Sequence, residues 1–143
     1  MRRFSLNISH AYSILSSALQ LCESGAPGFS NPTHTGTLHH NLGDLLRERQ
    51  QLDECKLQLD RADSCFPANS LSEFEAFLAA SALDRERLLQ ESDAKRCVFA
   101  EIAAVIATRA RLLESQHLLE EAEKLFTKSL NALRVSVSVR IVI

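Results

Sequence analysis

Glycine and proline are scarce in this 143-residue chain, which has four glycines and three prolines, all at or before Pro67. These two residue types are the strongest local breakers of helices. Their absence from residue 68 onward leaves more than half of the chain without such a breaker. Since apolar residues also recur at helical spacing, the sequence predicts an all-α protein, and its length favours one domain.

Long apolar runs and a strong net charge are also absent. No segment approaches the roughly 18 apolar residues that would indicate a transmembrane helix. The formal net charge is −2, which gives no bias toward nucleic acid or an anionic membrane. Signatures of nucleotide binding, acyl transfer and zinc hydrolysis do not occur. The sequence therefore predicts a chain with no membrane span, no nucleic-acid partner, no cofactor or metal, and no enzymatic activity.

The cysteines form no C-x-x-C pair and complete no metal-site spacing with histidine. They are Cys22, Cys55, Cys65 and Cys97. Without a secretory signal, we expect reduced, mostly buried thiols inside a cell. A catalytic set can be written with Cys55, His40 and Asp44, but Cys55 is expected at a helix crossing, where a thiol is inert.

Three histidines, His34, His39 and His40, lie close together in the sequence. Adjacent helical positions such as 39 and 40 do not face each other. A solvated helix start is therefore expected here in preference to a metal site.

A 34-residue pattern of apolar and small residues covers residues 36 to 69. Its first half places His39, Leu42, Gly43 and Leu46 at helical spacing. Its second half continues with Cys55, Leu59 and Ala62 and stops at Pro67. A glycine inside a helix costs about 1 kcal/mol relative to alanine, so Gly43 needs a reason beyond helix propensity.

This pattern resembles the tetratricopeptide repeat, W-x-x-L-G-x-x-Y followed by A-x-x-x-F and P. Leu42, Gly43 and Pro67 match in type, whereas His39 replaces the large aromatic residue. The resemblance implies two antiparallel helices that approach closely at Gly43 and Cys55, with a turn at residues 47 to 52. It also implies a right-handed superhelical array, an α-solenoid of helix hairpins. The loop between Leu21 and Thr35, with Asn31-Pro32 before Asn41-Leu42-Gly43, is similar to repeats of the kinesin-light-chain type.

Partial repeats of this spacing pattern occur both before and after it in the sequence. Ala11, Leu15 and Ala18 repeat the spacing of the second helix upstream, and Ala122, Phe126 and Ser129 repeat it downstream with a shift of 67. We therefore expect a helical domain at 1–134, with the clearest repeat at 36–69, partial repeats at 8–23 and 98–134, and a degenerate unit at 70–97.

The degenerate unit begins with Ser70-x-x-Glu73, which predicts a capping box. An apolar stripe then runs through Phe74, Phe77, Leu78, Ala82 and Leu89.

A further helix is expected from about Ala94 to Leu113, capped at Ser92-Asp93. Its register stays open, because Ala110 in the place of Gly43 would put Arg109 at a core position, whereas Ile106-Ala107 in that role avoids the conflict.

The two ends of the chain carry signals of another kind. The first 22 residues contain Arg2, Arg3, several serines and no acid, a composition shared with mitochondrial presequences. At the other end, in a tail at 135–143 whose structure stays open, Val135, Val137, Val139 and Ile141 alternate with polar residues up to Arg140, which is typical of a half-buried strand. We assign no function to that tail.

The sequence contains no recognised catalytic motif, so the function is inferred from the expected architecture. In stacked helix pairs the first helices line a concave groove. The residues that face it here are Thr37, His40, Asn41, Asp44, Arg47 and Arg111. In similar repeats the amide at the place of Asn41 binds a peptide backbone, and Arg111 would pair with an acidic group.

The sequence predicts a cytoplasmic scaffold or adaptor that binds a protein or peptide in this groove. A mitochondrial assembly factor and a non-catalytic subunit of a larger enzyme complex are the alternatives. Because array ends are normally capped, self-association through incomplete repeat ends is a further expectation.

Overall fold

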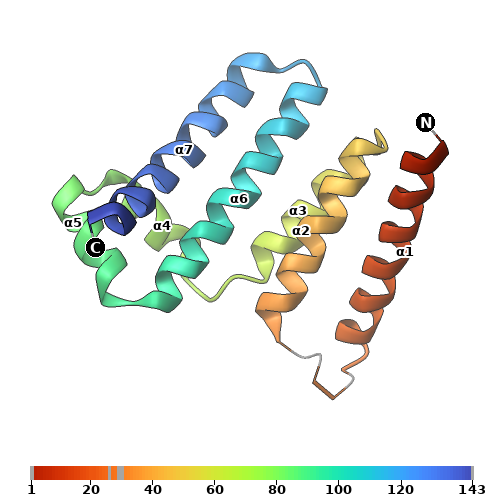
Figure 1. Cartoon of the computed structure of the whole chain (residues 1–143), viewed down its shortest axis with the longest axis horizontal. Helices are drawn as coiled ribbons and strands as arrows, with labels where there is room; N and C mark the ends of the chain where they lie inside the picture. Colours follow the sequence, from red (N-terminus) through yellow and green to blue (C-terminus); the bar gives the residue numbers. More distant parts are fainter. Residues whose placement is uncertain (1, 26, 29–30, 143) are drawn as a thin grey trace. The chain divides into compact units, whose positions relative to one another are not determined.

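The computed structural model of the chain is all-α (Figure 1). It describes residues 2–25, 27–28 and 31–142, and side chains from Asn7 to Leu133 within those ranges. Seven helices lie in this described part: α1 (Arg2–Glu23), α2 (Pro32–Glu48), α3 (Leu52–Ser64), α4 (Ser70–Ala79), α5 (Ala82–Glu91), α6 (Asp93–Ser115) and α7 (Leu119–Val142). The chain divides into two compact units, Met1–Cys65 and Phe66–Ile143, which are described separately below.

In the first unit, α2 and α3 form the antiparallel hairpin expected from the sequence, and α1 packs against α2. A Cβ atom placed on Gly43 would lie 3.2 Å from Leu59 Cδ2 and 3.5 Å from the carbonyl oxygen of Cys55. Cys55 and Leu59 have no exposed surface, so the close helix approach at Gly43 is confirmed. The small partner at this crossing is the backbone of Cys55, while the Leu59 side chain covers the glycine.

The loop before α2 is shorter than expected. The helix begins at Pro32, because Asn31 accepts a hydrogen bond from the backbone N–H of Thr33 at 2.9 Å. Proline fits the first helical position, where its missing N–H is not needed. At the other end of the hairpin, α3 ends at Ser64, before Pro67.

His39 is not in a solvated helix start. Its side chain is buried, and the ring Nδ1 lies 2.6 Å from Gln58 Oε1 on α3. Because a carbonyl oxygen only accepts, Nδ1 donates this bond. The bond satisfies a polar ring at the position where the repeat pattern has an apolar aromatic residue.

In the second unit, α6 and α7 form a second antiparallel hairpin, which α4 and α5 pack against. Its core consists of Phe74, Phe77, Leu89, Phe99, Ile102, Ala103 and Ala132. The Phe99 ring packs edge to face against Phe74, with centroids 5.7 Å apart, and lies 5.0 Å from Phe77. Phe74, Phe77 and Leu89 of the expected stripe thus lie in the interior of this unit and Leu78 packs against it, whereas Ala82 is exposed.

The stripe runs across a break that the sequence pattern did not predict. Residues 70 to 91 form two helices, because Ala80 is extended and Ser81 caps α5 by accepting a hydrogen bond from the Asp84 N–H at 3.3 Å. The Arg85 side chain donates to the carbonyl oxygens of Ala80, at 3.0 Å, and Leu78. These bonds satisfy the backbone carbonyl groups at the end of α4, so the helix ends there although neither a glycine nor a proline is present.

The expected capping box at Ser70 and Glu73 is wrong. Asn69 occupies the cap position of α4 in the left-handed conformation, and Ser70 is the first residue of the helix. The Glu73 carboxylate lies 3.5 Å from the Lys95 ammonium instead of reaching back to the helix start. The cap expected at Ser92 is confirmed, since its hydroxyl accepts the Lys95 N–H at 3.2 Å.

The register of α6 follows from burial and from the turn that follows it. Ala110 is fully buried, whereas Ala107 is only half-buried. Both hairpin turns have the same geometry: residues 50 and 117 have positive φ, and a backbone bond of 2.9 Å joins Gln51 N to Leu46 O in one and Leu118 N to Leu113 O in the other. Ala110 therefore corresponds to Gly43. Arg109 then corresponds to Leu42, and its side chain is half-buried at that position.

The alternating pattern at the C-terminal end, whose structure the sequence left open, forms no strand among the described residues. Helix α7 continues to Val142, because a helix satisfies its backbone groups within the segment, whereas a strand needs a partner. The side chains from residue 134 onward lie outside the described part, as do those of Arg2 and Arg3. Within the described residues, no helix combines the length and apolar character needed to cross a membrane.

Candidate functional site

The candidate site is an open groove between α1 and α2 in the first unit. It has a volume of about 390 Å³ and is lined by Ala11, Ile14, Leu15, Asn41, Asp44 and Leu45. Helix periodicity explains why α2 contributes these residues. Positions 39, 43 and 46 are buried, so positions 41, 44 and 45 lie on other faces of the same helix. We call this groove the α1–α2 groove.

The α1 wall of the groove is apolar and accessible. Ile14 is 55% exposed, and Leu15 is half-buried. Leu45 on α2 is also half-buried. Exposed apolar surface of this kind is stabilised by whatever covers it, at about 25 cal/mol per Å². The groove can therefore bind an apolar side chain of a partner.

Two polar side chains on α2 complete the groove. Asn41 is exposed, so its amide can both donate and accept hydrogen bonds. Asp44 accepts bonds from Arg47, with Nη2 and Nε at 3.0 and 3.2 Å from Oδ1. This ion pair compensates the charge of Asp44, which leaves Asn41 as the uncharged polar group able to bind a peptide backbone.

The structure brings some of the expected groove residues together and not others. Asn41 and Asp44 line the groove, and Arg47 contacts it only through Asp44. The Thr37 hydroxyl donates to the Thr33 carbonyl of its own helix at 3.1 Å. His40 is half-buried outside the groove lining.

Arg111 is exposed on α6 and belongs to the second unit. Its expected role in the same groove as Asn41 therefore stays a prediction.

Sequence reasoning missed the contribution of α1. Ala11 and Leu15 matched a repeat spacing typical of core residues, yet both are half-buried groove residues. The Arg49 guanidinium lies 5.0 Å from the centroid of the Tyr12 ring, which links α1 to the end of α2. An aromatic residue on α1 and an arginine after α2 were the available signal, but only the fold places them together.

Burial disfavours a reactive thiolate at two of the four cysteines, Cys55 and Cys65. Cys55 is fully buried, and burial raises the pKa of the Cys65 thiol. A raised pKa lowers the fraction of reactive thiolate near neutral pH. Among the described residues, no three histidine, cysteine or acidic side chains are grouped so that they could hold a metal ion.

Comparisons of the chain with protein-family models, with curated proteins and with solved structures found no match in any of the three.

Proposed function

We propose that this protein is a tetratricopeptide-type array of α-hairpins that binds an extended peptide or a helix of a partner protein and performs no chemistry. In this proposal it is a cytoplasmic scaffold or adaptor. Four cysteines without a disulfide support a reducing location.

The repeat character is supported by the likeness of the two hairpins. Gly43 and Cys55 in the first correspond to Ala110 and Ala122 in the second, and all four are buried. The shift between the hairpins is one residue short of two 34-residue repeats. Small residues at both crossings allow the same close helix approach, as a tetratricopeptide array requires.

The observation that carries the binding proposal is the chemistry of the α1–α2 groove. Ile14 offers exposed apolar surface opposite the Asn41 amide. An extended peptide presents both kinds of group at once, because its side chains alternate with backbone N–H and C=O groups. Asn41 would bind the peptide backbone, while Ile14 and Leu45 would bind one apolar side chain.

The test is selection of binders from a displayed library of random peptides, followed by affinity measurement with the best binders. We expect Asn41→Ala to weaken binding about tenfold, because a buried peptide group would lose its partner. Ile14→Ser should weaken binding to a similar extent by removing apolar surface.

Asn131→Ala is the matched control, because Asn131 is an exposed helical asparagine of the second unit. It should leave the affinity unchanged. Arg111→Ala, with exposed Arg87→Ala as its control, tests whether the second unit contributes to the same site. Unchanged affinity in both Asn41→Ala and Ile14→Ser would show that peptides do not bind in this groove.

A further inference from the structure

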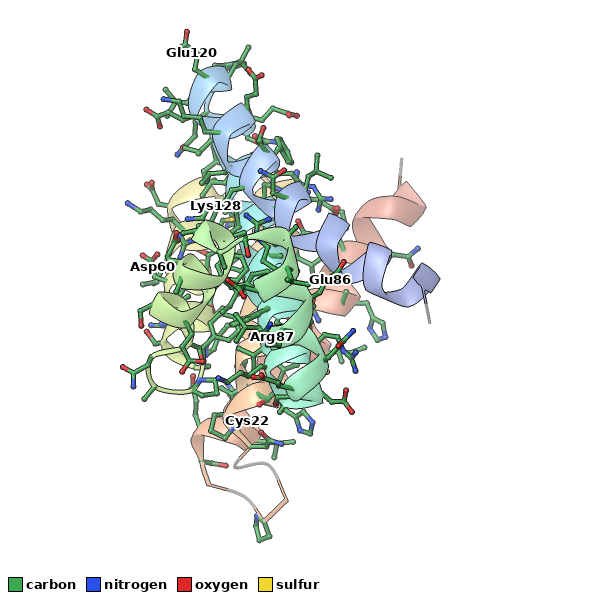
Figure 2. All side chains as sticks on the ribbon, turned by 90° about the vertical axis from the view of Figure 1, so that its left-hand side faces the viewer. Cys22, Asp60, Glu86, Arg87, Glu120 and Lys128 are labelled. Atoms are coloured by element: carbon green, nitrogen blue, oxygen red, sulfur yellow. The ribbon has the colours of Figure 1, made fainter. Side chains whose placement is uncertain are left out.

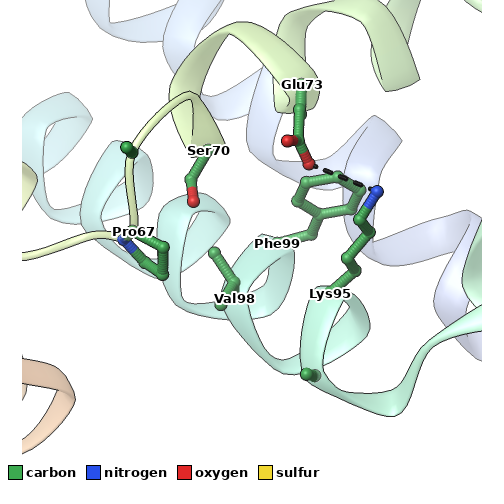
Figure 3. A pocket seen from close by; sticks show the side chains of 8 residues that line it. Pro67, Ser70, Glu73, Lys95, Val98 and Phe99 are labelled. Carbon is green, nitrogen blue, oxygen red and sulfur yellow. Dashed lines mark ion pairs between the residues drawn. The ribbon is translucent and has the colours of Figure 1, made fainter.

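A second cleft, independent of the α1–α2 groove, lies in the second unit where the first turns of α4 and α6 meet (Figure 3). Its main lining residues are Pro67, Ser70, Glu73, Lys95, Val98 and Phe99, and its volume is about 210 Å³. Sites for drug-sized ligands have about 300–1,000 Å³. The α4–α6 cleft is therefore large enough for one small group of atoms, such as a single apolar side chain.

The apolar side of this cleft rests on the packed core. Phe99 is 6% exposed and belongs to the cluster of three phenylalanine rings. Val98 is half-buried beside it, and Pro67 closes one edge. Because Phe99 is held by the neighbouring rings, the cleft has a preformed apolar surface.

Ser70 is the unusual residue of the cleft. It is only 7% exposed, and its hydroxyl makes no hydrogen bond with any described residue. Asn69 holds the cap position that the serine would otherwise take. In Figure 3 the Ser70 hydroxyl points toward Val98 in the cleft. Among the described residues no buried side-chain oxygen lacks a partner, so this hydroxyl reaches solvent in the cleft, where a ligand can accept its hydrogen bond.

Two helix N-termini and Lys95 favour an anionic group in the cleft, whereas the Glu73 carboxylate opposes it. The N-terminal turns of two helices, α4 at Ser70 and α6 at Lys95, meet there, and helix N-termini attract negative charge. Lys95 pairs with Glu73 at 3.5 Å across the cleft, and both side chains are about half exposed. Ion pairs this exposed are weak, so a carboxylate in the cleft can compete with Glu73 for the ammonium group.

We propose that the α4–α6 cleft binds a carboxylate joined to one small apolar group. The apolar group packs on Phe99 and Val98, and the carboxylate accepts hydrogen bonds from Ser70 and Lys95. A free short-chain acid and the C-terminal residue of a peptide share this chemistry.

The experiment is a titration of the full-length, isotope-labelled protein, followed through its backbone amide resonances. The probes are 4-methylpentanoate, its uncharged amide, and a short peptide ending in leucine with a free or an amidated C-terminus. We expect the acid to shift the resonances of Ser70, Lys95 and Phe99 saturably, and the amide to bind about tenfold more weakly. Tighter binding of the free-ended peptide than of the acid would identify a peptide terminus as the source.

Variants separate the proposed contacts from general effects. Lys95→Met should weaken binding of the acid about tenfold, whereas Lys56→Met, an exposed lysine of α3 in the first unit, should not change it. Ala94→Leu should fill the cleft and abolish binding, which tests the site even if Ser70→Ala does not fold.

Equal affinity for the acid and its amide, or no saturable shift in the cleft, would overturn the proposal. Asn41→Ala should leave binding of the acid unchanged, so that failure here is separate from failure of the α1–α2 groove.

Discussion

At Gly43 the backbone of α2 approaches α3 so closely that a methyl group has little room. The nearest atom to an added Cβ, Leu59 Cδ2 at 3.2 Å, belongs to a fully buried leucine that cannot move without displacing its neighbours. The local cost of glycine in a helix is offset by the packing of α2 on α3. Residues of the same type need not share this role, because an added Cβ at Gly25 would contact nothing within 4 Å.

We predict that Gly43→Ala lowers the free energy of unfolding by about 1 kcal/mol. The substitution gains about 1 kcal/mol of helix propensity, but overpacking a buried site costs about 1–3 kcal/mol. Denaturant unfolding followed by circular dichroism measures the difference. Ser17→Ala, at an exposed position of α1, is the control and should not destabilise the protein. A Gly43→Ala variant more stable than the parent would contradict the close approach.

The elements of the second unit depend on caps supplied by side chains. The division between α4 and α5 requires no breaker residue, because Ser81 starts one helix and Arg85 binds the carbonyl groups that end the other. The Arg85 guanidinium also lies 5.9 Å from the centroid of the Phe77 ring. One arginine thus joins the helix end to the aromatic core.

We predict that Arg85→Met lowers the free energy of unfolding by about 1–2 kcal/mol, because it leaves the Ala80 and Leu78 carbonyl groups without these donors. Arg87→Met on the same helix is the matched control, since Arg87 is exposed and Figure 2 shows its position on α5. Thermal unfolding compares the two variants. Equal melting temperatures would show that the bonds of Arg85 do not hold the end of α4.

Across the chain, α1 and the helices of the second unit differ in how many apolar side chains they bury. The second unit contains three buried phenylalanines, whereas the described part of α1 buries only Leu19. Figure 2 shows Glu120 projecting outward from the first turn of α7. Local stability follows buried apolar contacts, so the helices are expected to open separately.

We predict that the backbone amides of α1 exchange with solvent fastest and those of α6 slowest. Hydrogen exchange measured by mass spectrometry on the native protein resolves the two helices. The reason is the difference in burial: α6 buries Phe99, Ile102 and Val105 among others. Equal protection of α1 and α6 would mean that the chain unfolds as one cooperative unit.

Three features could be predicted from the amino-acid sequence alone: the helical class, the Gly43 crossing and the cap at Ser92. The Gly43 crossing was predicted from the likeness of residues 36 to 69 to a repeat. The helical class and the cap depend on residues near in the chain, since propensity, capping and breaker effects act within a few positions. For the same reason Asn41 and Asp44 could be placed on the solvent side of α2.

Four features became apparent only in the folded chain: the burial of His39, the break at Ala80, the α1 wall of the groove and the unpaired hydroxyl of Ser70. Each depends on a side chain from another helix or on competition between two residues for one role, as between Asn69 and Ser70 for the cap. The alternating tail shows the same effect, because a strand pattern without a partner strand continues as the helix that precedes it. Periodicity states which residues share a face, and packing decides what that face contacts.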